Sequence, residues 1–71
     1  GIGSRVRLRD VDSGESLEFI LVGSAESDPA QNRISNESPV GRAIMGRRAG
    51  EVVEVAVPDG IIHYKIEEVH R

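Results

Sequence analysis

Residues 38–46 have the sequence SPVGRAIMG, which is the strongest helix signal in this chain of 71 residues. Ser38 can accept a hydrogen bond from a free backbone N–H group of a first turn, and Pro39 suits the first helical position because its missing N–H costs nothing there. Gly46 is placed to end the helix. Three apolar side chains share one helical face, namely Val40, Ala43 and Ile44. Because Gly41 weakens the helix, and a helix of about two turns is unstable alone, the stretch predicts a sheet that covers this face.

Two strands are expected after the helix. Residues 51–57 (EVVEVAV) and residues 61–69 (IIHYKIEEV) alternate between two faces, as half-buried strands do. The inward side chains are expected to be Val53, Val55, Val57, Ile62, Tyr64 and Ile66. Pro58-Asp59-Gly60 forms the turn between the strands, because proline presets φ and glycine tolerates a positive φ. A bulge near Glu67-Glu68 would return Val69 to the core side.

Two more strands are expected before the helix. Residues 5–11 (RVRLRDV) alternate strictly, and residues 16–23 (SLEFILVG) follow a turn that contains Gly14. The inward side chains are expected to be Val6, Leu8, Leu17, Phe19 and Leu21. Arg33-Ile34-Ser35 can add a short strand. The predicted fold class is α+β, with a mainly antiparallel sheet of four to five strands wrapped on one short helix, in a single domain over residues 1–71.

The composition excludes several classes of protein. There is no cysteine, which rules out disulfides and thiolate metal sites. No apolar run approaches the ~20 residues of a membrane span, so we expect no membrane contact and a cytoplasmic location. Nine basic and twelve acidic residues give a formal net charge of −3. Phe19 and Tyr64 are the two aromatic residues, too few to stack the bases of a single strand.

Arg5, Arg7 and Arg9 form the one local concentration of positive charge on an expected strand. Their spacing of two would place them on the same face. Such a row fits either the solvated face of an edge strand or a phosphate-binding stripe. We favour the solvated face of an edge strand because the chain as a whole is acidic, and direct nucleic-acid binding stays the alternative.

The residues that catalysis or metal binding would need are sparse. His63 and His70 are seven positions apart, which places them on opposite faces of a strand unless a bulge intervenes. Glu26 and Asp28 could bind a hard cation, but a solvated acidic loop is favoured because two acids without further ligands make a weak site. The neighbours Glu67-Glu68 point apart in a strand, which argues against an acid–base couple. We therefore expect no catalytic residue, no metal site and no cofactor.

Binding is the more natural use of this chain. Residues 24–33 (SAESDPAQNR) form a polar surface loop that is long for so small a domain, and such a loop is either mobile or used for binding. Pro39 is expected to lie exposed beside Glu37 and Ser38, in a mixed patch that a basic partner surface could accept. On the residues alone, a helix cap is the favoured explanation of Ser38 and Pro39, and a binding patch is the alternative.

The same region resembles a known family signature. Residues 24–29 (SAESDP) and 33–46 (RISNESPVGRAIMG) resemble the signature of the Gre-type bacterial transcription elongation factors, the GreA/GreB family. That signature is E-A-D-P followed by K/R-I-S-x-x-S-P-x-G/A-R-A-L-L-G. Residues 49–53 (AGEVV) resemble its G-D-x-V segment, and residues 3–15 resemble its first hairpin, so the resemblance covers nearly the whole chain. Met45 stands where leucine is usual, and the spacing between the two signature segments is long.

The resemblance implies the carboxyl-terminal domain of a Gre factor, with an FKBP-like fold. In the family, this domain docks on bacterial RNA polymerase at the secondary-channel rim of the largest subunit. An amino-terminal coiled coil enters the channel and promotes cleavage of backtracked transcripts by the polymerase's own active site. No heptad run is present here and the chain begins at Gly1 rather than methionine, so we expect a domain cut from a longer protein.

The implied domain is a monomer without catalytic activity, and its contact with nucleic acid is indirect, through the polymerase complex. Prolyl isomerase activity is not implied, because two aromatic residues cannot build the aromatic-lined pocket that such activity uses. The alternative within the family is an anti-Gre regulator that occupies the same rim and inhibits transcription.

The resemblance also implies which residues dock. By position they are Asp28 in the loop, and Glu37, Ser38 and Pro39 at the helix start. Glu37 keeps the acid that the family has just before Ser-Pro. Arg42 matches the signature too and fits either a docking or a structural role.

Overall fold

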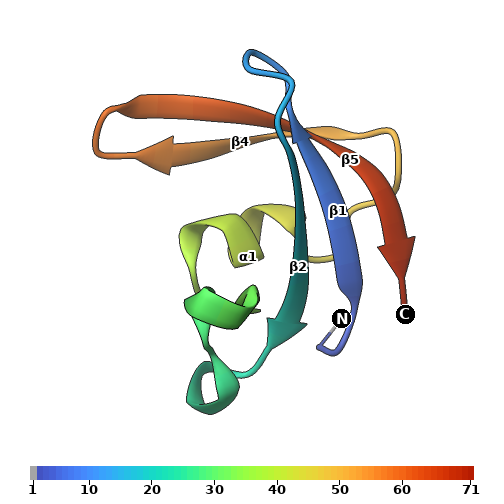
Figure 1. Ribbon diagram of the computed structural model, residues 1–71, viewed down its shortest axis with the longest axis vertical. Coiled ribbons are helices and arrows are strands. Elements are labelled where there is room, and N and C mark those ends of the chain that lie inside the picture. The colour runs from blue at the N-terminus through green and yellow to red at the C-terminus, as the bar shows by residue number, and fades with distance from the viewer. Residues whose placement is uncertain (1) are drawn as a thin grey trace.

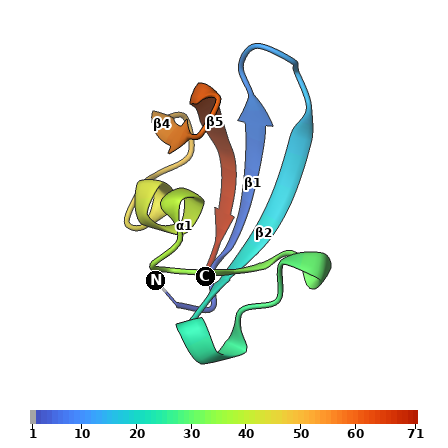
Figure 2. The same cartoon turned by 90° about the vertical axis from the view of Figure 1, so that its left-hand side faces the viewer.

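The computed structural model describes residues 2–71, whose five strands form one sheet in the order β3-β2-β1-β5-β4 (Figure 1). The strands are β1 (Arg5–Asp10), β2 (Ser16–Val22), β3 (Arg33–Ser35), β4 (Val52–Val57) and β5 (Gly60–His70). Between β2 and β4 lie two 3-10 turns, η1 (Ser24–Glu26) and η2 (Pro29–Gln31), and one α-helix, α1 (Pro39–Ile44). Figure 2 shows that α1 covers one side of the sheet.

Two antiparallel hairpins build most of the sheet, as the sequence predicts. β1 pairs with β2, β4 pairs with β5, and an antiparallel β1–β5 pair joins the two hairpins. β3 is added parallel to β2, so the sheet is mixed. The predicted α+β class, with a mainly antiparallel sheet wrapped on one short helix, is confirmed.

The position of β1 differs from the prediction. The row of arginines was interpreted as the face of an edge strand, but β1 lies in the middle of the sheet, between β2 and β5. The sequence pattern shows which face of a strand is buried, but it contains no information on which strand pairs with which. That interpretation is therefore wrong for β1, although its arginine face is indeed the face away from the core.

The predicted bulge in β5 is present. Arg7 lies opposite Glu68, while the next residue, Leu8, lies opposite Ile66, so Glu67 is the extra residue. The bulge brings Val69 opposite Val6 on the core side, where it packs against the buried cluster. The extra residue also shifts the alternation of β5 by one position. Odd-numbered residues such as His63 point outward before the bulge, and even-numbered residues such as His70 point outward after it.

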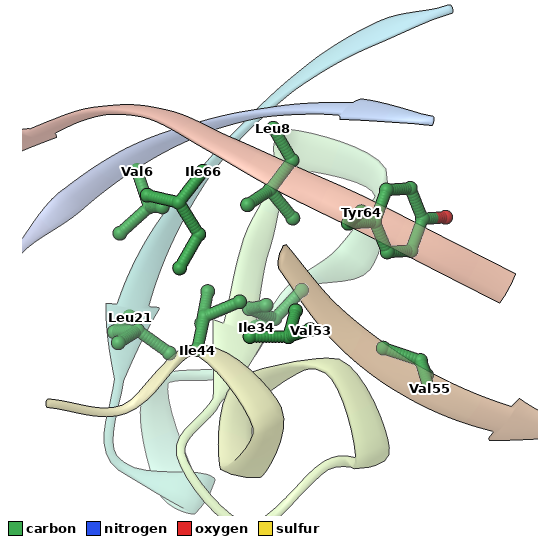
Figure 3. Close-up of a cluster of buried hydrophobic side chains, with 9 residues drawn as sticks. All are labelled: Val6, Leu8, Leu21, Ile34, Ile44, Val53, Val55, Tyr64 and Ile66. Carbon is green, nitrogen blue, oxygen red and sulfur yellow. The ribbon is translucent and has the colours of Figure 1, made fainter. Parts of the chain in front are cut away.

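The hydrophobic core lies between the sheet and α1 (Figure 3). Every strand and the helix contribute to its nine buried side chains: Val6, Leu8, Leu21, Ile34, Ile44, Val53, Val55, Tyr64 and Ile66. The remaining predicted inward residues of the strands, together with Val40 and Ala43 of α1, are partly buried against this cluster. The alternation in the sequence therefore predicted the inward faces correctly.

The helix is shorter than the stretch that predicts it. α1 ends at Ile44 because Met45 already has an extended ψ of 126°, and Gly46 follows with a positive φ of 73°. Ser38 is the N-cap and Pro39 the first helical residue, as predicted.

Gly41 has a role that the sequence analysis did not anticipate. It is buried, and a Cβ added at this position would lie 2.0 Å from the backbone oxygen of Ser35. The glycine therefore lets α1 approach the end of β3 more closely than any other residue would allow.

Candidate functional site

The chain turns sharply between β3 and α1, and two serines fix that turn. The Oγ atom of Ser38 donates to the backbone oxygen of Ser35 at 2.7 Å and accepts from the N–H group of Gly41 at 3.1 Å. A serine in this position satisfies one of the free N–H groups of the first helical turn. The start of the helix is thereby attached to the end of β3.

Glu37 is exposed and is held in place from two sides. Its backbone N–H donates to the Oγ atom of Ser35 at 2.9 Å, and its carboxylate accepts from the Oγ atom of Ser24. The hydroxyl groups of Ser24 and Ser35 are themselves 3.0 Å apart. Because the ion pairs found in residues 2–71 do not include Glu37, its negative charge is ordered but not neutralised.

Pro39 and Arg42 complete this part of the surface. Both are exposed and lie three positions apart on α1, so they are neighbours on its solvent side. The Nε atom of Arg42 donates to the backbone oxygen of Glu37 at 3.0 Å. We call the four residues Glu37, Ser38, Pro39 and Arg42 the α1 patch. It combines an acid, a hydroxyl group, an apolar ring and a cation on one short, hydrogen-bonded segment.

Asp28 does not join the α1 patch. It forms an isolated bridge with Arg33, with N···O distances of 2.7 and 3.0 Å, and its carboxylate accepts from the side chain of Gln31 at 2.9 Å. Arg33 begins β3, whereas Glu37 comes after its end. Along the chain, η2 follows Asp28 and leads into the first end of β3, whereas α1 follows its other end. The structure thus divides the five predicted residues into four that lie together and one that lies apart.

The loop that contains Asp28 is more regular than predicted. It includes η1 and η2, and Asn32 adopts a left-handed conformation with φ of 59°. The backbone N–H of Ile20 donates to Asn32 at 2.9 Å, which ties the end of the loop to β2. Within the part of the chain that the structure describes, no group of three or more His, Cys, Asp or Glu side chains is placed to hold a metal ion, and no pocket is found.

A second charged region lies on the outer face of the sheet, across β1 and β5. The carboxylate of Glu67 accepts a hydrogen bond from Arg9 at 2.9 Å and lies 3.6 Å from the Nε atom of Arg7. Another nitrogen atom of the Arg7 guanidinium group donates to Glu68. The two glutamates were expected to point apart, but the bulge lets both reach Arg7, so that expectation is wrong. The hydrogen bond from Arg9 lowers the pKa of the Glu67 carboxyl group below its ordinary value.

The histidines belong to the same outer face. The bulge places His63 and His70 on one side of β5, where the Nε2 atom of His63 lies 3.3 Å from Glu54 and that of His70 lies 2.7 Å from Glu68. The hydrogen bond from His70, followed by the charge of Arg7, lowers the pKa of the Glu68 carboxyl group. Each histidine is thus paired with its own glutamate rather than with the other histidine.

Comparison with known proteins places this chain in a family. The family model for "Transcription elongation factor, GreA/GreB, C-term" matches residues 1–71. The chain belongs to the GreA/GreB family. The transcription elongation factor GreA of Clostridium botulinum (strain Hall) is 54% identical over 70 residues, which cover 99% of this chain and 44% of the relative. GreA of Clostridium kluyveri is 52% identical over 71 residues, which cover 100% and 45%. The chain thus spans slightly less than half the length of these relatives.

Solved structures support the same assignment. Gfh1 of Thermus aquaticus superimposes with a TM-score of 0.91 at 36% sequence identity, covering 100% of this chain and 47% of the other. A GreA/GreB elongation factor of Nitrosomonas europaea gives a TM-score of 0.81 at 32% identity, covering 99% and 59%. The recognition of a Gre carboxyl-terminal domain from the signature residues is therefore confirmed.

Two features of this Gre domain were missed at the sequence level. The first is the role of Ser24 and Ser35, which hold Glu37 although Ser24 is separated from it by 13 positions. The second is the close approach at Gly41. Ser35 and Gly41 belong to the family signature, but the contact of Ser24 with Ser35 depends on β2 and β3 being neighbours in space, and the role of Gly41 depends on the turn between β3 and α1. In residues 2–71, no helix is long and apolar enough to span a bilayer.

Proposed function

We propose that this Gre domain is the RNA polymerase-binding part of a transcription elongation factor that promotes cleavage of backtracked transcripts. The domain docks at the secondary-channel rim of the polymerase's largest subunit and does not itself perform chemistry. It acts as a monomer in the cytoplasm and touches nucleic acid only indirectly. The catalytic effect requires an amino-terminal coiled coil elsewhere in a longer protein.

The α1 patch is the observation that carries this proposal. Its carboxylate at Glu37 is exposed and unneutralised, yet it is fixed by Ser24 and Ser35 before any partner arrives. A side chain that is already ordered loses little conformational entropy on binding, so an unpaired but fixed acid is well suited to a basic partner surface. Pro39 adds a rigid apolar contact beside it. Asp28, at the other end of β3, is proposed as a separate and more peripheral contact.

A competition titration tests the proposal. Labelled full-length GreA is bound to bacterial RNA polymerase core, and the unlabelled 71-residue domain is added in excess. Displacement of the label is expected. Glu37→Lys and Pro39→Ala should each weaken the displacement, while the free energy of unfolding changes by no more than about 1 kcal/mol, as is usual for exposed positions.

Asp59→Lys provides the matched control. Asp59 is an exposed acid in the β4–β5 turn, and its reversal changes the net charge by the same amount as Glu37→Lys. Equal weakening by both charge reversals would mean that only overall charge matters, and the α1 patch would not be the docking site. Unfolding of both Glu37→Lys and Pro39→Ala would assign these residues a structural role instead.

A second candidate function is inhibition at the same rim. The fold is shared with Gfh1, a GreA factor homolog, as well as with GreA/GreB elongation factors, so it does not by itself decide between promotion and inhibition of cleavage. The two functions are distinguished with the full-length protein in a transcript-cleavage reaction on backtracked complexes. Faster cleavage supports the first function, and slower cleavage than in the polymerase alone supports the second.

A further inference from the structure

Positive charge is concentrated at the end of the α1 patch and just beyond it. The ten residues from Pro39 to Arg48 contain three arginines and no acid, in a chain whose formal net charge is −3. The three are Arg42, Arg47 and Arg48, and all of them are exposed. This concentration differs from the arginine row of β1, where Arg7 and Arg9 are already bound to glutamates.

The loop after α1 is built in a way that leaves the side chain of Arg48 available. One carboxylate oxygen of Glu51 accepts from the backbone N–H of Arg48 at 2.6 Å, and the other lies 3.7 Å from the guanidinium group of Arg47. The backbone of Gly50 donates to Ile66 at 2.7 Å, which fixes the end of the loop on β5. The side chain of Glu51 thus holds the loop by accepting from the backbone of Arg48, and it does not pair with the side chain of Arg48.

Two of the three guanidinium groups keep their charge unpaired. Among residues 2–71, neither Arg42 nor Arg48 takes part in an ion pair; Arg42 bonds only a backbone carbonyl. The carboxylate of Glu37, the one acid of the α1 patch, bonds Ser24 rather than either guanidinium group. The exposed surface therefore starts at Glu37, with the guanidinium group of Arg42 beside it, and has its basic end at Arg48, beyond a helix that rises about 9 Å.

We propose that this surface, from Glu37 through Arg48, is one continuous contact whose basic end binds an acidic segment of the protein on which the domain docks. This inference rests on the proposed function and adds the charge pattern of the partner. The partner segment carries a basic group opposite Glu37 and carboxylates opposite Arg42 and Arg48. Such a two-signed surface fixes the direction in which the domain lies, because the reversed orientation would place like charges together.

A protein partner fits this surface better than a nucleic acid. Glu37 would repel a phosphate backbone placed along the same face, and the domain is acidic overall. The aromatic side chains offer no stacking platform here, because Tyr64 is buried in the core and Phe19 packs against it. Arginine also pairs with carboxylates in a planar, two-bonded geometry, which suits an acidic protein segment.

Arg48→Glu tests the inference in the same competition titration. The change leaves the bond from the backbone of Arg48 to Glu51 intact, so the fold should be retained, and a thermal melt checks this. Displacement of full-length GreA should weaken roughly tenfold, which equals about 1.4 kcal/mol. Arg48→Lys should retain most of the affinity. Arg5→Glu, an equal charge reversal at an exposed residue on the outer face of the sheet, should have little effect.

The outcomes separate this inference from the proposed function. If the wild-type domain displaces GreA but Arg48→Glu and Arg42→Glu displace it equally well, the basic end makes no contact and the inference is overturned, while the proposed function stands. If the wild-type domain displaces nothing, both are overturned. If the domain alone binds single-stranded RNA with a salt-dependent affinity that Arg48→Glu abolishes, the basic end is a nucleic-acid site and not a protein contact.

Discussion

On the outer face of the sheet, arginines of β1 lie against glutamates of β5, whereas arginines at α1 lie beside backbone carbonyls or solvent. Arg7 and Arg9 share Glu67 and Glu68 in a network that joins the two central strands. Arg42 bonds the backbone of Glu37, and Glu37 bonds a serine hydroxyl group. Both regions are ordered, but only the network on β1 and β5 satisfies its charges internally.

This difference shows that the location of charge in a sequence is a poor guide to binding. The arginine row of β1 is the more regular pattern, yet its charges are largely neutralised by a strand that lies far away in the sequence. The α1 patch shows a less regular pattern, but its charges remain available to a partner. An exposed charge that is fixed by neutral groups is the better indication of a contact surface, because binding it requires no existing ion pair to be broken.

Gly41→Ala should have the largest effect on this comparison, because it removes the close approach on which the α1 patch depends. The added Cβ would lie 2.0 Å from the backbone oxygen of Ser35, so α1 must shift away from β3. Alanine normally favours a helix by about 1 kcal/mol over glycine, but here we expect a net loss of about 2 kcal/mol or more. Urea denaturation measures the free energy of unfolding.

Gly46→Ala is the control for this substitution. Gly46 has a positive φ of 73°, but a Cβ there would meet no atom within 4 Å, so the cost is limited to backbone strain of about 1 kcal/mol. If Gly41→Ala is less destabilising than Gly46→Ala, α1 can move away from Ser35 at little cost in free energy, and the close contact is not required for stability. The outer-face network, which lies on the other side of the sheet, should be unaffected by either change.

The case of Gly41 illustrates what the sequence could and could not predict. Alternation of apolar residues predicted the two hairpins and the inward faces, and the doubled Glu67-Glu68 predicted the bulge, because these features depend on neighbours in the chain. The same reasoning assigned Gly41 only a cost in helix propensity. Its actual role depends on the turn between β3 and α1, where the backbone and the hydroxyl group of Ser38 both donate to the backbone oxygen of Ser35 and hold it against Gly41, and the alternation of apolar residues does not indicate this turn.

In the candidate site, too, the local features were predicted and the features that depend on the tertiary structure were not. Ser38 and Pro39 were assigned correctly as cap and first helical residue, because capping is a local rule. The division between Asp28 and the other four residues was not predicted, since it depends on β3 lying between them. The pairing of Arg7 with both glutamates was missed for a related reason, because a bulge changes which side chains share a face.

Ser38→Ala should have an intermediate effect. It removes the hydrogen bond to Gly41 and the one to Ser35, and loss of a helix N-cap costs about 1 kcal/mol. For a domain of this size that corresponds to a fall in melting temperature of about 4–8 °C, measured by circular dichroism. Ser38→Thr should restore most of the loss because it keeps a hydroxyl cap. If alanine and threonine are equivalent, the cap does not stabilise the start of α1.

Glu67→Gln should change the free energy of unfolding least. Its effect is seen in how strongly the stability depends on pH. The hydrogen bond from Arg9 lowers the pKa of Glu67 in the folded state, so the folded state is stabilised when the carboxyl group is ionised. This contribution is complete above the ordinary pKa of glutamate, which is about 4.3, and is lost as the pH falls through the lowered folded value. Glutamine cannot ionise and does not show this loss.

The measurement is the melting temperature at neutral pH and at about pH 3, where the glutamates become protonated. The wild-type domain should lose more melting temperature between the two conditions than Glu67→Gln does. Glu15→Gln is the matched control, because the side chain of Glu15 makes no hydrogen bond or ion pair within residues 2–71. If the two variants lose the same amount, the network of β1 and β5 does not stabilise the fold, and its contrast with the α1 patch is one of geometry alone.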